Sequence, residues 1–266
     1  MLKIILNRLK PQAGKIAAEK QAVFRAGRNV TEQIFNLRIL CDKYLQHQQD
    51  LYHAFIAFSK AFDWVWHAAL WATVKKSNIS ANLIPVIKHL YDKATSAVLL
   101  KGGIGDWFRT TVGVRQRCLL SSILFSIFLK RIMADALEGH EGIVFMRGRT
   151  ITNLRFADDI DGLAGEEEEL AKLLERLDKA STAYGMEISV EKNKLITNNT
   201  SGINNEIKVN GQKLETVASF QYWARFYLKR IFKPERLSWI AQTTAALTRL
   251  RQIGTTGAYL SVPRYI

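Results

Sequence analysis

The spacing of apolar residues predicts strands and helices that alternate along the chain. Residues 51–58 are apolar at both odd and even positions, which is typical of a central strand buried on both faces. Residues 119–137 are apolar nearly all round, which predicts a buried helix. Residues 150–157 and 160–164 read as two strands around a tight turn, so a hairpin is expected there.

The pattern continues with a helix over residues 167–184, which has one leucine stripe, acidic residues in its first turn and Gly185 after its end. Short strands are expected at 187–190 and 194–197. The resulting order is β-α-β-β-α-β, the split βαβ plan. In this plan the end of the first strand lies beside the hairpin turn, so position 57 is expected to face Asp158. The plan alone does not determine function.

Other segments carry weaker patterns. A helix is expected from Asn29, a second after Asp63 as its N-cap, and a third from Ser80, with Pro85 near its first turn. Strands are expected at 97–101 and 220–223, and a last helix at about 234–253.

Composition narrows the class of partner. The 266 residues carry a formal net charge of +14, which favours a polyanion, either nucleic acid or an anionic membrane. No stretch reaches the roughly 20 apolar residues that span a bilayer, so we expect no membrane insertion. Cys41 and Cys118 lie far apart, and the five histidines have no zinc-site spacing. We therefore expect an intracellular protein, nuclear or cytoplasmic, that is not secreted.

Two adjacent carboxylates, Asp158 and Asp159, follow the apolar run at 150–157. Carboxylate oxygens are the ligands that Mg²⁺ prefers, and two Mg²⁺ ions can activate a hydroxyl and stabilise a phosphoryl transfer. Adjacent residues of a strand point to opposite faces, so Asp158 is assigned as the principal ligand and Asp159 as the secondary one. Taken alone, these residues fit an ordinary aspartate turn better.

The surrounding motifs change that assessment. Residues 54–63 read AFIAFSKAFD, and residues 156–159 read FADD. Residues 112–125 read VGVRQRCLLSSILF, and residues 185–194 read GMEISVEKNK. Together with FRAGR at 24–28 and FQY at 220–222, these segments resemble, in family order, six motifs of the reverse transcriptases of non-LTR (LINE-like) retrotransposons. The resemblance runs from about residue 19 to residue 250.

The resemblance implies an α+β right-hand polymerase, with fingers, a ferredoxin-like βαββαβ palm and a truncated thumb. Fingers and palm would cover residues 15–200, and primer-grip strands with the start of the thumb would cover 201–266. It implies RNA-directed DNA synthesis with two Mg²⁺ ions, and as partners an RNA template, a DNA primer or RNA–DNA hybrid, and deoxynucleoside triphosphates. It also implies that an upstream endonuclease is missing here.

The resemblance assigns roles residue by residue. Asp158, Asp159 and the backbone carbonyl of Phe58 would be metal ligands, and Lys192 would protonate the departing pyrophosphate. The residues that would contact nucleotide, template or primer are Phe62, Gln116, Arg115, Arg25, Arg28 and Tyr222, with Phe62 as the gate that excludes a 2′-hydroxyl. Most of these residues also have a plainer interpretation: a core aromatic for Phe62, solvated surface for the arginines and Gln116, and a strand edge for Lys192.

Several positions depart from the family pattern. Ala57 stands where the family has the aspartate that bridges both metals. Arg117 replaces a glycine, Ser122 a proline, and Trp223-Ala224 a Leu-Gly pair. We therefore expect impaired polymerase activity. The alternatives are a non-catalytic protein that still binds RNA or hybrid duplex, and a relic of a retrotransposon with no selected role.

Overall fold

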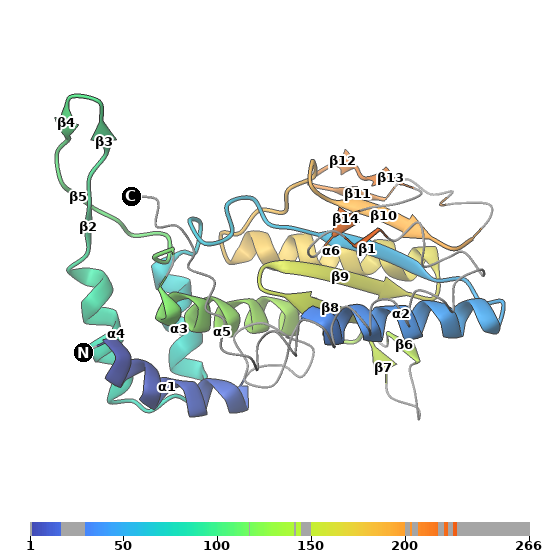
Figure 1. The fold of residues 1–266 in the computed structure, drawn as a ribbon, viewed down its shortest axis with the longest axis horizontal. Coiled ribbons are helices and arrows are strands. Elements are labelled where there is room, and N and C mark those ends of the chain that lie inside the picture. The colour runs from blue at the N-terminus through green and yellow to red at the C-terminus, as the bar shows by residue number, and fades with distance from the viewer. Residues whose placement is uncertain are drawn as a thin grey trace, which may run out of the picture.

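The computed structural model describes residues 2–16, 30–116, 118–140, 142–144, 150–199, 203, 207–217, 221–222 and 226–227. Its centre is a five-stranded sheet with strand order β13-β10-β1-β9-β8 (Figure 1). The strands are β1 (Tyr52–Ile56), β8 (Asn153–Phe156), β9 (Asp159–Ala164), β10 (Lys194–Thr197) and β13 (Glu215–Thr216). All neighbours are antiparallel except β10 and β13.

Helices cover both faces of this sheet. The even-numbered residues of β1 pack in one core with α5 (Leu119–Ala136) and α6 (Glu167–Ala183). The odd-numbered Phe55 packs in a second core with α2 (Val30–Gln46). Because side chains alternate along a strand, burial of all five β1 residues follows from this two-sided cover.

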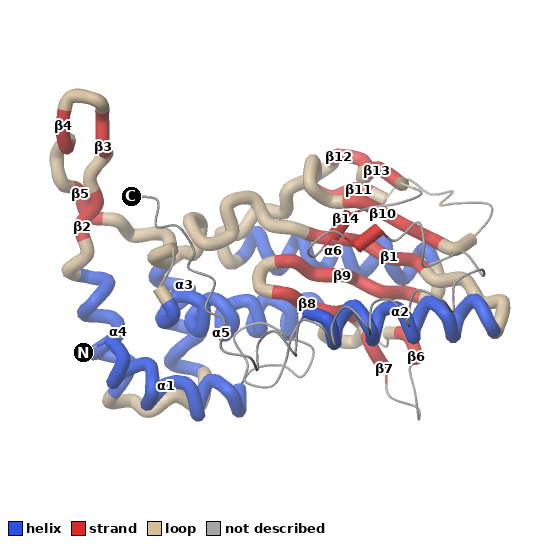
Figure 2. Tube along the Cα trace, viewed as in Figure 1, coloured by secondary structure: helices blue, strands red, loops and turns tan. Residues whose placement is uncertain are grey.

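Three further helices gather at the end of the molecule away from the sheet (Figure 2). They are α1 (Leu2–Ile16), α3 (His67–Lys76) and α4 (Leu83–Asp92). Helices α1 and α3 pack against α5, and α4 packs against both α1 and α3. The long apolar helix α5 therefore packs against the sheet and α6 and also against α1 and α3, which explains why it is hydrophobic nearly all round.

Short strand pairs complete the described part of the chain. A projecting hairpin is made of β2 (Thr95–Ser96) with β5 (Phe108–Arg109), and of β3 (Leu99–Leu100) with β4 (Gly103–Ile104) (Figure 1). The other pairs are β6 (Ile143–Val144) with β7 (Thr150–Ile151), β11 (Lys208–Val209) with β12 (Gln212–Lys213), and β14 (Gln221–Tyr222) with β15 (Phe226–Tyr227).

The predicted β-α-β-β-α-β order is confirmed. The elements β1, α5, β8, β9, α6 and β10 come in this order along the chain, with other elements between some of them, and the four strands are neighbours in the sheet. Helix α6 ends before Gly185, whose φ of +75° suits glycine. The strand predicted at 187–190 is reduced to a single bridge between Ile188 and Phe58. Helix α4 begins at Leu83 rather than Ser80. The helix predicted at 234–253 lies outside the described residues.

Candidate active site

The turn between β8 and β9 carries the paired aspartates. Phe156 pairs with Asp159, so only Ala157 and Asp158 span the turn. Ala157 has a φ of +57°, which residues with a Cβ adopt rarely. A positive φ at the first central residue but not at the second, Asp158, is the pattern of a type II′ hairpin turn, which matches the twist of the two strands. The turn places Asp158 at its tip and Asp159 at the first residue of β9.

The two carboxylates crowd each other. Asp159 is half-buried, and burial together with the charge of Asp158 raises its pKa to about 6, while Lys192 acts in the opposite direction. Two anionic groups that repel at short range favour either a shared proton or a bound cation. Lys192 is exposed, and its charge lowers the pKa of Asp159.

Position 57 lies beside Asp159. Ile56 pairs with Ile160, so extending the register by one residue places Ala57 opposite Asp159, one residue from the predicted neighbour Asp158. The Ala57 N–H donates to Oδ1 of Asn193 at 2.7 Å, and its carbonyl accepts from the Ser189 N–H at 2.9 Å. The backbone is therefore held in place at this position, and the side chain on it is a methyl group.

The carbonyl of Phe58 points toward the hairpin side. In the bridge between Phe58 and Ile188, the groups that bond to residues 187–189 belong to Ala57 and Ser59. Because peptide groups of an extended chain alternate in direction, the Phe58 carbonyl points the opposite way. This orientation fits the predicted metal-ligand role of the carbonyl.

The loop before α5 docks onto the loop after β1. Nε2 of Gln116 donates to Oδ1 of Asp63 at 3.1 Å. Gly113 has a φ of +87°, and a Cβ there would lie 3.1 Å from the Asp63 carbonyl oxygen, so glycine allows the close approach. The predicted N-cap role of Asp63 is wrong, because α3 begins only at His67 and its N-cap residue is Trp66. Asp63 instead holds Gln116.

Phe62 has features of both a core aromatic and a residue that could contact a ligand. Its ring stacks on Phe125 with centroids 4.7 Å apart and planes inclined by 21°, yet the residue stays half-exposed. Phe62 thus combines core packing with an accessible side. Arg115 is exposed. Arg25, Arg28 and Arg117 lie outside the described residues, and for Tyr222 only the backbone pairing with Phe226 is described.

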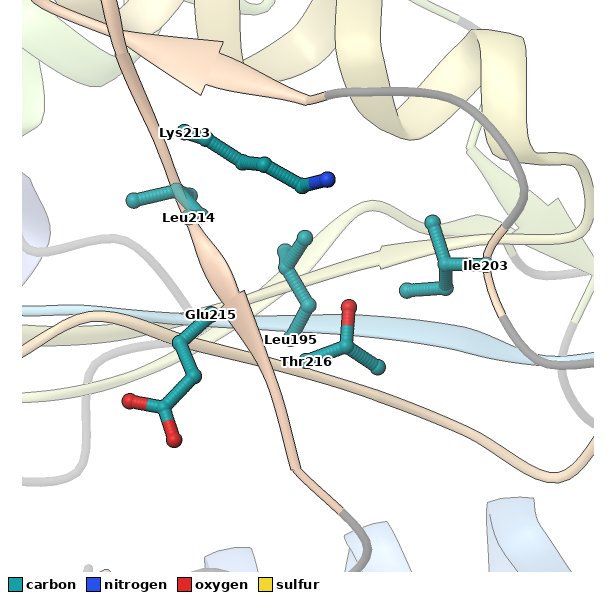
Figure 3. Close-up of a pocket in the computed structure, with 6 residues that line it drawn as sticks. All are labelled: Leu195, Ile203, Lys213, Leu214, Glu215 and Thr216. Carbon is teal, nitrogen blue, oxygen red and sulfur yellow. The ribbon is translucent and has the colours of Figure 1, made fainter.

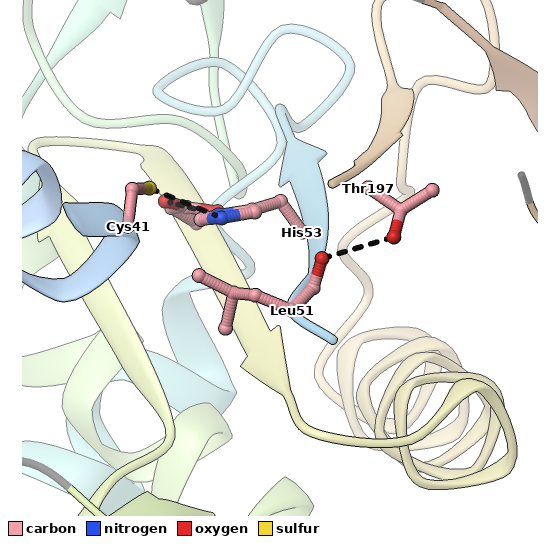
Figure 4. Close-up of polar contacts among 5 residues, drawn as sticks. Cys41, Leu51, His53 and Thr197 are labelled. Atoms are coloured by element: carbon pink, nitrogen blue, oxygen red, sulfur yellow. Dashed lines mark hydrogen bonds and ion pairs between the residues drawn. The ribbon is translucent and has the colours of Figure 1, made fainter. Parts of the chain in front are cut away.

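A buried polar cluster on the same sheet was not predicted. Nδ1 of His53 lies 3.4 Å from both carboxylate oxygens of Asp161, and its Nε2 lies 3.6 Å from Sγ of Cys41 (Figure 4). All three residues are fully buried. The signal was present in the sequence: a histidine and an aspartate each interrupt an apolar strand.

A cavity of about 490 Å³ lies at the outer edge of the sheet, lined by Leu195, Ile203, Lys213, Leu214, Glu215 and Thr216 (Figure 3). Strands β10 and β1 separate β13 from β9, a distance of about 14 Å at ordinary strand spacing. Glu215 is bound by Lys194, with 2.7 Å between Oε2 and Nζ. This cavity is therefore distinct from the aspartate turn.

Across the described ranges no group of three or more His, Cys, Asp or Glu side chains could hold a metal ion. In the same ranges no helix is long and apolar enough to cross a membrane.

Comparison with known proteins decides the family. The profile described as "Reverse transcriptase (RNA-dependent DNA polymerase)" matches residues 1–232. The chain belongs to the reverse transcriptase family. Its sequence is similar to the Pol polyproteins of two retrotransposable elements: type-1 R2 of Nasonia vitripennis (26% identical, covering 82% of this chain and 21% of the relative) and type-2 R2DM of Drosophila melanogaster (26% identical, 55% and 14%). The chain thus spans about a fifth or less of these relatives.

The fold of this reverse transcriptase domain is similar to that of telomerase. A truncated apo telomerase from Candida tropicalis superposes with a TM-score of 0.54 at 21% identity, covering 79% of this chain and 41% of the other. Telomerase of the same organism in complex with a fragment of telomeric RNA gives 0.54 at 18% identity, covering 80% and 35%. The non-LTR reverse transcriptase resemblance seen in the motifs is confirmed.

Proposed function

We propose that the chain is the polymerase core of an RNA-directed DNA polymerase, in which the turn between β8 and β9 is the nucleotidyl-transfer site. The observation that carries this proposal is the turn itself: two crowded carboxylates beside Lys192, at the edge of a β-α-β-β-α-β sheet in a reverse transcriptase chain. In this proposal the sheet with α5 and α6 is the palm. Fingers and palm extend over residues 15–200, and primer grip and early thumb over 201–266.

The substrates follow from the residues that the sequence motifs assign to the site. Phe62 offers its accessible side to the sugar of a deoxynucleoside triphosphate, and Asp63 holds Gln116 where it contacts nucleotide or template. Arg115, with Arg25 and Arg28, provides guanidinium groups for the triphosphate. Lys192 is the proton donor for the leaving pyrophosphate, and Tyr222 belongs to the primer grip. The RNA template and DNA primer are attracted by the charge of +14.

The donor set fits one divalent cation better than two. Asp158, Asp159 and the Phe58 carbonyl would provide hard oxygen ligands. Burial together with the charge of Asp158 raises the pKa of Asp159, which supports a site that lacks positive charge. The third carboxylate expected in the family is replaced by the methyl group of Ala57, which offers no oxygen. When bound, Mg²⁺ supplies charge neutralisation at the transferred phosphate. Loss of about 4 kcal/mol of transition-state stabilisation would slow the reaction about a thousandfold.

Primer extension on a primed RNA template tests the proposal. We expect Ala57→Asp to extend the primer at least about a hundredfold faster than the natural chain. Ala57→Asn introduces a side chain of the same shape as aspartate but without its charge, so it should not increase the extension rate. Adding Asp158→Ala to Ala57→Asp should abolish the increase. Both Mg²⁺ and Mn²⁺ should be tried. Equal rates for the natural chain and Ala57→Asp would show that position 57 is not part of the metal site.

A non-catalytic protein that binds RNA or RNA–DNA hybrid is the second candidate, and Ala57 is the observation that favours it. It predicts salt-dependent RNA binding with no nucleotide incorporation by the natural chain. Flat or absent binding to hybrid duplex at low salt would contradict both candidates.

A further inference from the structure

The projecting hairpin exposes aromatic surface that no described part of the chain covers. Trp107 is 66% exposed and Phe108 is 47% exposed, at the base of the hairpin where β5 pairs with β2. Single exposed apolar side chains are ordinary on protein surfaces, but larger contiguous exposed patches mark interaction sites.

The segment that follows the hairpin is joined to the loop after β1, which carries two further exposed tryptophans. Val112 forms a bridge with Trp66, and the Gly113 N–H donates to the Val65 carbonyl at 2.9 Å. Trp66 is 49% exposed and Trp64 is 39% exposed. Directly beyond, Gln116 is bound to Asp63. The backbone therefore connects the hairpin base to the loop that follows β1, at the edge of the proposed site.

The charge of the surrounding segment is suited to phosphate. Between residues 92 and 116 there are four cations and two anions, all of them exposed: Lys93, Lys101, Arg109 and Arg115 against Asp92 and Asp106. Across the described ranges none of these four cations forms an ion pair. Aromatic planes interleaved with unpaired cations are what proteins use to hold single strands, because every base has a π-face and every nucleotide a phosphate.

We propose that Trp107 and Trp66, with Arg109, form a stacking surface for single-stranded nucleic acid, which guides the template strand toward the turn between β8 and β9. The identification of the bound strand as a template rests on the proposed function, but the binding itself does not require polymerisation. Phosphates contact Arg109 while bases stack on the two indoles. The aliphatic tip of the hairpin, at Val98, Leu99 and Ile104, has no π-face and no role in this surface.

The test measures binding of a fluorescent single-stranded RNA of roughly 20 nucleotides by anisotropy, in EDTA and at low salt. We expect Trp107→Ala and Trp66→Ala each to weaken binding about tenfold, and Trp107→Phe to preserve most of the affinity. Leu99→Ala is the matched control, since Leu99 is 79% exposed on the same hairpin but is aliphatic. Thermal unfolding midpoints of all variants should equal that of the natural chain, because these side chains are exposed.

Two results would overturn the proposal. One is unchanged RNA affinity in both Trp107→Ala and Trp66→Ala. The other is an equal loss in Leu99→Ala, with a change of oligomeric state, which would assign the hairpin to a protein partner. Because binding is measured in EDTA without nucleotides, it can succeed where primer extension fails. Failure of the stacking surface and failure of the polymerase proposal are therefore separate outcomes.

Discussion

Two aspartates of strand β9, two residues apart, occupy opposite electrostatic situations. Asp159 stands at the open end of the strand, half-buried beside Asp158, with exposed Lys192 as the cation that acts on it. Asp161 is fully buried, and both of its oxygens lie 3.4 Å from Nδ1 of His53. Residues i and i+2 of a strand share a face, so the two carboxylates point to the same side of the sheet.

Burial raises the pKa of both carboxylates, but the neighbouring charges that add to or oppose this rise differ. At Asp161 the imidazole of His53 opposes the rise. Burial would lower the pKa of His53, yet the charge of Asp161, aided by Cys41, raises it to about 10. At Asp159 the neighbouring Asp158 adds to the rise instead. The fold thus places a buried imidazole against Asp161, whereas at Asp159 the opposing cation is the exposed Lys192.

Breaking the buried pair should have the largest effect. In His53→Leu the carboxylate of Asp161 loses its partner in the interior, so we expect the free energy of unfolding to fall by about 3–5 kcal/mol. Chemical denaturation measures this. The double variant His53→Leu with Asp161→Leu removes both charges and should recover most of the loss. A double variant as unstable as the single one would mean that volume, rather than charge, makes His53 important.

The second prediction concerns the turn. In Ala57→Asp, Mg²⁺ at a hundred times its dissociation constant should raise the free energy of unfolding by about 2.7 kcal/mol over EDTA. Adding Asp159→Asn should abolish this increment. Adding His53→Leu with Asp161→Leu should leave the increment intact, because the buried pair binds no external cation. A Mg²⁺ increment that survives Asp159→Asn would place the cation elsewhere.

The third prediction uses pH to separate the two regions. The folded-state pKa of His53, about 10, lies above its ordinary value of 6.5. Its contribution to stability is therefore complete below pH 6.5 and is lost as the pH rises toward 10. We expect the free energy of unfolding to fall by roughly 2 kcal/mol between about pH 7 and pH 9, and by much less in the double leucine variant. Parallel pH profiles would show that His53 is neutral in the folded chain.

The fold could be predicted because its signals are local and repeated. The all-round apolar character of residues 119–136 and the leucine stripe of α6 indicate burial wherever the helices pack. The start of α3 could not be predicted, since Asp63 favours a cap by propensity but is used to hold Gln116 from 53 residues away. Such a contact exists only once the fold has formed.

For the candidate site, the sequence could predict only the residues that are adjacent in the chain. Asp158 and Asp159 were evident as a motif, but the register that places Ala57 opposite Asp159 depends on how β1 pairs with β9. A shift of one residue in register changes which carboxylate is adjacent, and apolar strands buried on both faces give no alternation to fix it. The pairing of His53 with Asp161 could not be predicted either, because the two residues lie 108 positions apart and meet only through the pairing of β1 with β9.

The smallest expected effect lies at Asp159, and its sign is the informative part. Its folded-state pKa of about 6 lies above the ordinary 3.8, so the ionised group opposes folding above pH 6 and does not do so below pH 3.8. In EDTA at about pH 8, Asp159→Asn should therefore stabilise the chain by about 1 kcal/mol, a value reduced for solvent screening at this half-exposed site. The gain should vanish near about pH 4, which denaturation at the two pH values measures. Asp161→Asn is the matched control and should destabilise at both, because it leaves buried His53 without its carboxylate. If both substitutions changed stability in the same direction, the turn would be held together like the interior of the sheet. It would then lack the excess of negative charge that a cation site requires.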